Sequence, residues 1–162
     1  MAAVDYFLKL DGIEGESHDA KHKGEIDLES WAWGESQNGI HAIGGGGGAG
    51  KVEMQDFYFT MKMNKASPKL MLFCANGVHI KKAVLTCRKA GKDQQEFLKI
   101  EFTDLLVSSY QTGGSGHSDI VPTDQISLNF AKIELTYKQQ NPDGTLGGPV
   151  QAGWDLKQNK QA

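Results

Sequence analysis

The feature that most constrains how this chain folds is an alternation of apolar and polar residues that changes phase within single segments. Residues 25–35, 51–63 and 125–137 alternate with a period of two, which is typical of β-strands. In the first of these segments the apolar set passes from the parity of Ile26 to that of Trp31. Such a change requires a bulge, or a strand that buries opposite faces in its two halves. The pattern therefore predicts a strongly bent sheet that curls toward a barrel.

Shorter alternating segments predict the remaining strands, at residues 4–10, 80–88, 96–104, 106–112 and 154–158. Turn-forming residues fill the connections at 112–119 and 141–149, where Gly, Pro, Asn and Asp gather. The chain has no internal repeat and no linker, so residues 1–162 are expected to form one domain.

One helix is predicted at residues 67–77. Ser67 is a suitable N-cap, Pro68 occupies the first helical position, and Gly77 can adopt the left-handed C-terminal cap. One face of this helix is expected to pack against the barrel, namely that of Leu70, Phe73 and Cys74.

Charge and composition exclude several classes of protein. The formal net charge is −3, both signs are interspersed, and no Lys or Arg run occurs, so neither nucleic acid nor an anionic membrane is an expected partner. No apolar run reaches the ~18 residues of a membrane span. The start, MAAVDYFLKLDG, does not resemble a signal peptide. We expect synthesis in the cytoplasm, export only by a route that accepts folded protein, and buried free thiols at Cys74 and Cys87.

The run GGGGGAGKV, residues 44–52, satisfies most of the phosphate-binding pattern G-x-x-x-x-G-K-[ST]. A phosphate loop needs a helix after it, and a hydroxyl after the lysine to ligate magnesium. Here Val52 follows Lys51 and begins an alternating strand, so no cofactor is expected. If the protein were an enzyme, nucleotide hydrolysis at this loop would be the reaction to expect. The glycines instead predict a loop whose backbone can lie close to another chain.

Two other patterns contain residue types that occur in chemical sites. His18 and His22 have the spacing of zinc ligands on a helix, but no further Cys or His cluster accompanies them, so a solvated loop is expected. The loop 113–119 contains Ser, His and Asp, yet neighbouring residues of one loop cannot reach the geometry of a catalytic triad. No catalytic or metal-binding residue is therefore predicted.

The pair Trp31 and Trp33 places two indoles on one side of a strand, with Ser30 and Ala32 on the other. Two interpretations remain open for the small residues. They belong either to a sparsely covered outer face, or to the wall of a cavity or channel in which bulky side chains are excluded.

The chain resembles the haemolysin-coregulated protein (Hcp) family, the tube subunits of bacterial type VI secretion. The stretches that carry the resemblance run across nearly the whole chain: FLKLDGIEGES (7–17), EIDLESWAWGESQ (25–37), GGGGGAGKVEMQDFYFTMKMNKASPKLM (44–71), RKAG (88–91), TGGSG (112–116), LNFAKIELTY (128–137) and GGPVQAGWDLKQNK (147–160).

The resemblance implies a mainly β fold: a compact β-barrel of two packed, mostly antiparallel sheets, with one short flanking helix and a protruding Gly-rich loop. It further implies a homohexameric ring with no enzymatic activity. Rings would stack into a tube that carries effector proteins in its lumen, bears a spike protein at its tip and lies inside a contractile sheath. The secretion system would then export the tube without a signal peptide. The alternative is a cytoplasmic chaperone or adaptor ring for effectors that never enters a tube.

The resemblance also assigns candidate residues. Ser30 and Ala32 are candidates for the lumen and its cargo; relatives can carry serine at the position of Ala32, which lacks that hydroxyl. The loop that would contact the next ring comprises Ile40, His41, Ile43, Gly44, Gly45, Gly46, Gly47, Gly48, Ala49, Gly50 and Lys51.

Overall fold

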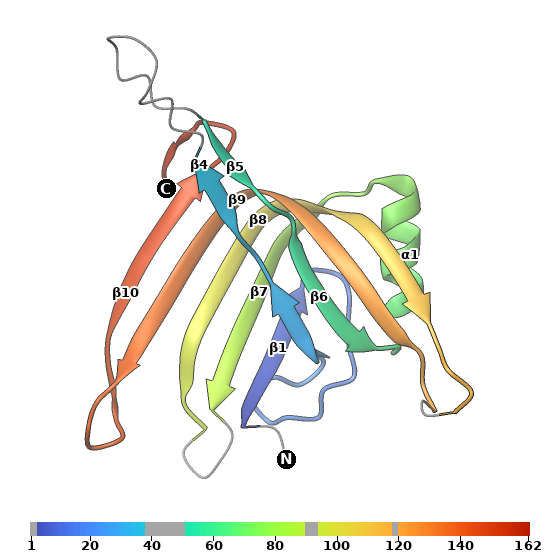
Figure 1. Cartoon of the computed structure of the whole chain (residues 1–162), viewed down its shortest axis with the longest axis horizontal. Coiled ribbons are helices and arrows are strands. Elements are labelled where there is room, and N and C mark those ends of the chain that lie inside the picture. Colours follow the sequence, from blue (N-terminus) through green and yellow to red (C-terminus); the bar gives the residue numbers. More distant parts are fainter. Residues whose placement is uncertain (1–2, 38–50, 90–93, 118–119) are drawn as a thin grey trace.

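The computed structural model describes residues 3–37, 51–89, 94–117 and 120–162. Within these ranges the protein is mainly β, with one helix beside a strongly curved sheet (Figure 1). The elements are β1 (Val4–Leu10), β2 (Ile26–Asp27), β3 (Ser30–Ala32), β4 (Glu35–Gln37), β5 (Val52–Met54), β6 (Phe57–Lys62), α1 (Ser67–Asn76), β7 (Ile80–Lys89), β8 (Glu96–Gly113), β9 (Thr123–Gln140), β10 (Leu146–Asp155) and β11 (Lys160–Gln161).

The strand pairs of the described chain are antiparallel and fall into two sheets. The larger sheet follows the order β11-β10-β9-β8-β7-β1-β2, while β6 pairs with β9 and carries β3 on its other side. The smaller sheet contains β4 and β5. Strand β9 therefore has two partners along one edge, β6 at its beginning and β10 in its second half. The predicted fold class is confirmed.

Residues 26–32 connect the two sides of the curved sheet and explain the first change of phase. Their first part, β2, pairs with β1, and their last part, β3, pairs with β6. Between the two strands, the N–H of Leu28 donates to the carbonyl of Tyr6 in β1 (3.0 Å). The next N–H, that of Glu29, donates to the carbonyl of Thr60 in β6 (2.9 Å). The segment 25–35, predicted as one strand, is thus divided, because its first part pairs with β1 and its later part pairs with β6.

The two long strands β8 and β9 change phase together. Phe102 lies opposite Ile133, and Leu105 lies opposite Phe130, with all four side chains buried. Between these pairs the backbone of β8 passes through Asp104 at φ +52°, in the left-handed region that Asp tolerates better than most residues. Residues 96–104 and 106–112, predicted as two strands, are consequently one continuous strand with a bend.

The single helix is where the prediction was right about position and wrong about its cap. Gly77 adopts the left-handed conformation (φ +67°), and its N–H donates to the carbonyl of Phe73, as predicted. Ser67 is not the N-cap: Ala66 holds that position, without a side-chain hydrogen bond. The Ser67 hydroxyl accepts instead from the N–H of Asn64 (3.1 Å) and donates to Asp124 on β9 (2.6 Å).

Strand β10 also differs from the prediction of 154–158. It begins at Leu146 and ends at Asp155, and a turn follows, so residues predicted to form a loop belong to the strand. Pro149 is compatible with this place. Among the described residues, strand β10 pairs with β9 along one edge, while its other edge pairs only at Trp154 and Asp155, so proline stands where that second edge is open.

The segment around His22 is better ordered than a solvated loop. The His22 side chain is buried and stacks on Phe7 at a centroid distance of 4.3 Å. Its two ring nitrogens lie 2.8 Å from Glu25 and 2.7 Å from Glu96 on β8. The prediction for His18, which is exposed, is confirmed, whereas that for His22 is wrong.

Candidate functional site

The outward side chains of four neighbouring strand segments form a polar surface that contains Ser30 and Ala32. Both residues are exposed on β3, while Trp31 between them packs against the core and lies 6.2 Å from the ring of Phe57. The strand register continues this surface across β6, β9 and β8. We define the hydroxyl face as Ser30, Ala32, Tyr58, Thr60, Ser109, Gln111, Thr123, Gln125 and Ser127.

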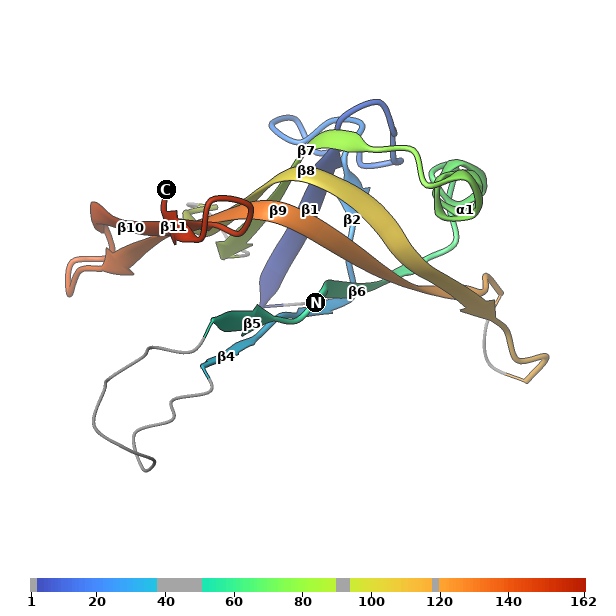
Figure 2. The same cartoon turned by 90° about the horizontal axis from the view of Figure 1, so that it is seen from above.

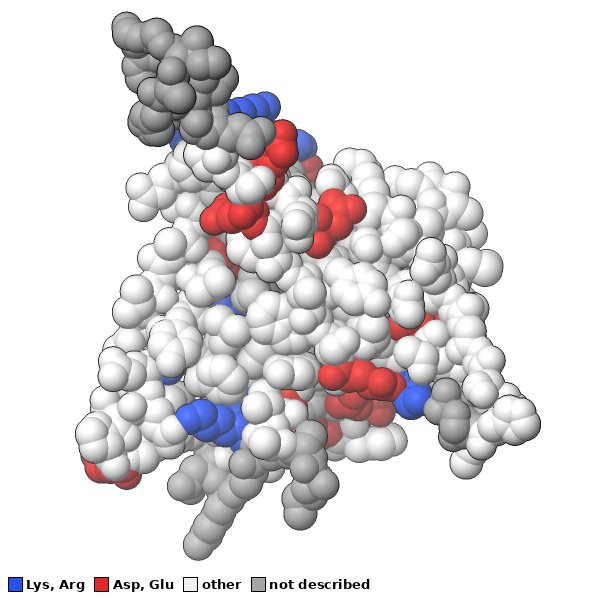
Figure 3. Space-filling model, viewed as in Figure 1, with Lys and Arg blue, Asp and Glu red and all other residues white. Residues whose placement is uncertain are grey.

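Hydrogen bonds between side chains cross this face. The hydroxyl oxygens of Ser30 and Thr60 lie 2.5 Å apart on neighbouring strands. At the end of β6, the ammonium of Lys62 donates to Thr123 (3.4 Å) and lies 3.6 Å from a carboxylate oxygen of Glu29. Figure 3 looks onto this side of the molecule and shows a middle region that is largely uncharged.

The side chains of the hydroxyl face are suited to weak, reversible contacts with water and with a polypeptide. Its residues carry hydroxyl, amide and methyl groups, and none is charged at neutral pH. Such groups hold water and form hydrogen bonds with a polypeptide without fixing its position. The face lacks a general base beside a nucleophile, so it offers no arrangement for covalent catalysis.

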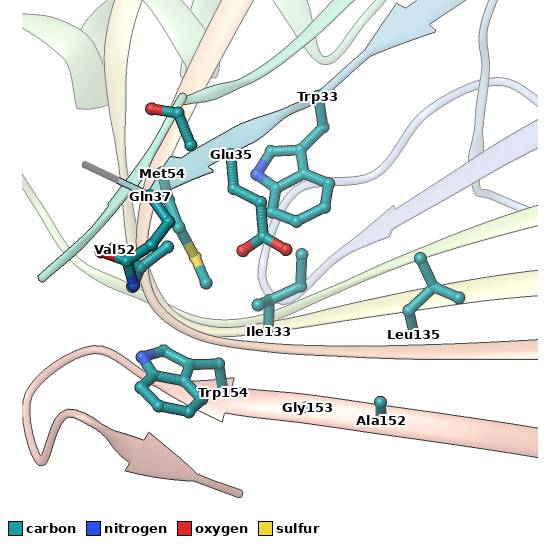
Figure 4. Close-up of a pocket in the computed structure, with 11 residues that line it drawn as sticks. Trp33, Glu35, Gln37, Val52, Met54, Ile133, Leu135, Ala152, Gly153 and Trp154 are labelled. Atoms are coloured by element: carbon teal, nitrogen blue, oxygen red, sulfur yellow. The ribbon is translucent and has the colours of Figure 1, made fainter. Parts of the chain in front are cut away.

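A second feature is an apolar cleft of about 620 Å³ between the β4–β5 sheet and the strands β9 and β10. Figure 4 shows Trp33, Met54, Ile133 and Trp154 turned toward this space from the two sides. Glu35 also points into the cleft and is the one charged residue of its lining. The lining consists of Trp33, Glu35, Ser36, Gln37, Val52, Met54, Ile133, Leu135, Ala152, Gly153 and Trp154.

The two tryptophans of the cleft each have an indole N–H group without a hydrogen-bond acceptor in the described structure. These two groups, of Trp33 and Trp154, are also buried. Buried donors without a partner are rare in native proteins, because leaving one unpaired costs about 1–3 kcal/mol. The carboxylate of Glu35 likewise makes no ion pair with a described residue.

The sequence predicted part of this arrangement. Trp31 and Trp33 lie on one side and both pack against the core, while Ser30 and Ala32 are exposed on the other, as the predicted alternation requires. The cleft itself was not predicted. Trp33 and Ile133 come from the second halves of their alternating segments, but Met54 comes from the first half of its segment and Trp154 from none of the three. Gly153 illustrates why the sequence was insufficient: a Cβ there would lie 2.8 Å from the carbonyl oxygen of Ile133, a residue twenty positions away.

Of the predicted loop residues, only Lys51 lies within the described ranges, where it is exposed directly before β5. Ile40, His41, Ile43, Gly44, Gly45, Gly46, Gly47, Gly48, Ala49 and Gly50 lie outside the described residues. A strand follows Lys51, as expected from the alternation and unlike the helix of a phosphate-binding loop.

Two features of the described residues bear on other classes of function. Within the described ranges, no three or more His, Cys, Asp or Glu side chains are grouped so that they could hold a metal ion. Among the described residues, no helix has both the length and the apolar character that a membrane span requires.

Comparison with known proteins identifies the family. Residues 7–137 match the family model described as type VI secretion system effector, Hcp. Over 162 residues the chain is 49% identical to Protein hcp1 of Pseudomonas aeruginosa, covering 99% of both chains. The crystal structure of Hcp1 from Salmonella typhimurium is 39% identical and superposes with a TM-score of 0.85 over 99% of this chain and all of that one. A structure described as a type six secretion system protein is 31% identical, with a TM-score of 0.93 and the same coverage. The chain therefore belongs to the Hcp family of type VI secretion system proteins, which is a family of structural proteins and not of enzymes.

Proposed function

We propose that this protein is the tube subunit of a type VI secretion system. Six copies close into a ring around a central channel, and rings stack into a tube. Effector proteins occupy the lumen, a spike protein sits at the tip, and a contractile sheath surrounds the tube and drives it out of the cell. The protein therefore reaches the extracellular space or a target cell.

The observation that carries this proposal is the hydroxyl face. A channel wall must keep water at its surface and let a protein pass, so it is expected to lack large apolar patches and strong fixed charge. The hydroxyl face meets both requirements, because the charge of Lys62, which lies at its edge beside Thr123, is balanced by Glu29. Small residues such as Ser30 and Ala32 also leave the channel wide.

A competing role is an effector chaperone or adaptor ring that stays in the cytoplasm. The two roles differ in their dependence on the secretion machinery. For the tube subunit, we expect the protein in culture supernatant of cells with an intact sheath, and only inside cells that lack the sheath protein. If both strains contained equal amounts of the protein inside the cells and none in the culture supernatant, the tube role would be rejected.

The loop of residues 40–51 is proposed to govern the stacking of rings. Shortening it should leave single rings intact and reduce the number of tubes seen by electron microscopy. Unchanged tube formation by a shortened variant would show that ring stacking uses other contacts.

A further inference from the structure

Helix α1 is apolar on both of its faces. Leu70 is buried and faces the core together with half-buried Phe73 and Cys74. On the opposite side, Met71 and Leu72 are 55% and 50% exposed. Together with exposed Pro68 and Ala75 they follow the spacing i, i+3, i+4, i+7 of one helix face. We define this outward set, Pro68, Met71, Leu72 and Ala75, as the α1 stripe.

A helix that is apolar all round is normally buried on all sides. The α1 stripe is continued just beyond the helix by Val78, which is 42% exposed. In the described structure α1 packs on β8 with one face only, so the stripe has no partner within the subunit. Another molecule is therefore expected to cover it.

The apolar cleft and the α1 stripe lie at opposite ends of the subunit. Figures 1 and 2 both place the cleft-forming strands β4, β5 and β10 toward one end of the long axis and α1 toward the other. A surface at one end that fits a surface at the other end produces a head-to-tail contact. Repetition of that contact closes a ring when the rotation between copies permits it.

The charges of the two surfaces are complementary. Glu35 is the one charged residue that lines the cleft, and Lys69 is the one charged residue of α1. Lys69 donates to the carbonyl of Gly12 (2.7 Å), and an ammonium has three donors, so it retains two for another acceptor. The cleft thus carries a negative charge at Glu35, and the helix carries a positive charge at Lys69, so the two can form an ion pair.

We infer that the occupant of the apolar cleft is the α1 stripe of a second copy of this chain. Met71 and Leu72 enter between Trp33, Met54 and Trp154, and Lys69 pairs with Glu35. The contact covers two apolar surfaces at once. The inference rests on the proposed ring and names the two surfaces that join its subunits.

Charge exchange tests the pairing. The variants Glu35→Lys and Lys69→Glu each place like charges together, and we expect each to weaken assembly about a hundredfold or more in sedimentation velocity. The double variant restores opposite charges, and we expect it to recover the wild-type sedimentation profile. Glu53→Lys is the matched control, because Glu53 is exposed on the other face of the β4–β5 sheet. Circular dichroism confirms that each variant is folded.

Disulfide trapping provides the second, independent measurement. In a Cys74→Ser background, Leu72→Cys combined with Ala152→Cys should give, after oxidation, a covalent ladder up to the full ring. Leu72→Cys combined with Lys99→Cys, which lies exposed on the far face of β8, should give no ladder. A ladder that stops at two copies would indicate a symmetric pair and overturn the inference.

The outcomes separate the two proposals. If wild-type protein forms rings while both charge variants also form rings and no ladder appears, the subunit contact is elsewhere and only this inference fails. If wild-type protein forms no ring at all, the proposed function fails as well, and the inference fails with it.

Discussion

The hydroxyl of Ser67, the first residue of α1, donates a 2.6 Å hydrogen bond to the completely buried carboxylate of Asp124 on β9. The bond joins the start of the helix to a strand 57 residues away in the sequence. It thereby fixes the position of α1 against the sheet, and with it the direction in which the α1 stripe points.

Replacing Ser67 by alanine should therefore destabilise the protein. The change leaves a buried carboxylate without one donor, which costs about 1–3 kcal/mol in the free energy of unfolding. Ser108→Ala is the control, since Ser108 donates a similar bond (2.7 Å) to Asp56 at the surface. Urea unfolding of both variants checks the prediction. If both variants lost the same free energy of unfolding, the buried hydrogen bond of Ser67 would contribute no more to stability than the exposed one of Ser108.

A second prediction concerns Gly15, which lies where two segments nearly touch. A Cβ at Gly15 would lie 2.5 Å from the carbonyl oxygen of Glu25 and 2.7 Å from the Cα of Ile26, so the backbone must move. We expect Gly15→Ala to lower the melting temperature clearly, because overpacking typically costs about 1–3 kcal/mol. Gly148→Ala, whose Cβ would meet no atom within 4 Å, should leave the melting temperature nearly unchanged. The reverse order in thermal denaturation would contradict the packing around Gly15.

The pH dependence of stability should reflect Arg88, a buried cation on β7. Its guanidinium donates to both carboxylate oxygens of Asp19 (3.0 and 2.7 Å) and to Asp5 (3.1 Å). The hydrogen bond from Arg88 holds the pKa of Asp19 well below its usual range. A carboxyl whose pKa is depressed by folding stabilises the folded state above its unfolded pKa, about 3.9, and this contribution is lost as the pH falls below that value.

Stability should therefore fall less steeply between about pH 4 and pH 2 in Asp19→Asn than in the wild type. Glu53→Gln, which removes an exposed carboxylate, serves as the control and should keep the wild-type profile. Guanidinium unfolding at a series of pH values gives the slopes. Identical slopes for wild type and Asp19→Asn would show that Arg88 does not favour the charged form of Asp19.

The local features of this fold were predictable from the sequence, and the contacts between distant segments were not. Alternation located β1 correctly, and Gly77 ended the helix where expected. Burial of His22 was missed because it depends on Glu96, 74 residues away. Ser67 was misassigned for the same reason: a serine before a helix is equally suited to cap it or to bond a strand.

The candidate site shows the same division. The exposure of Ser30 and Ala32 follows from strand periodicity, so the sequence was sufficient to predict it. The cleft requires knowing that Trp33 and Trp154 face each other across a space, which depends on how far the sheet curls. The changes of phase marked these segments as unusual without showing what they surround.

The hydroxyl face leads to a prediction about cargo. Replacing Ala32 by lysine should leave folding and ring assembly intact, because Ala32 is exposed and belongs neither to the lining of the cleft nor to the α1 stripe. The added bulk and charge should reduce the amount of effector that purifies with the protein. Loss of the fold in circular dichroism, in place of loss of cargo, would show that Ala32 supports the core.

The most direct test is electron microscopy of negatively stained wild-type protein, purified at high concentration. If apolar surfaces at the two ends of each subunit are covered by neighbouring copies, the images will show annular particles of six copies around an empty centre. Compact particles of single-subunit size, with no annular assembly at any concentration, would contradict the ring and the function built upon it.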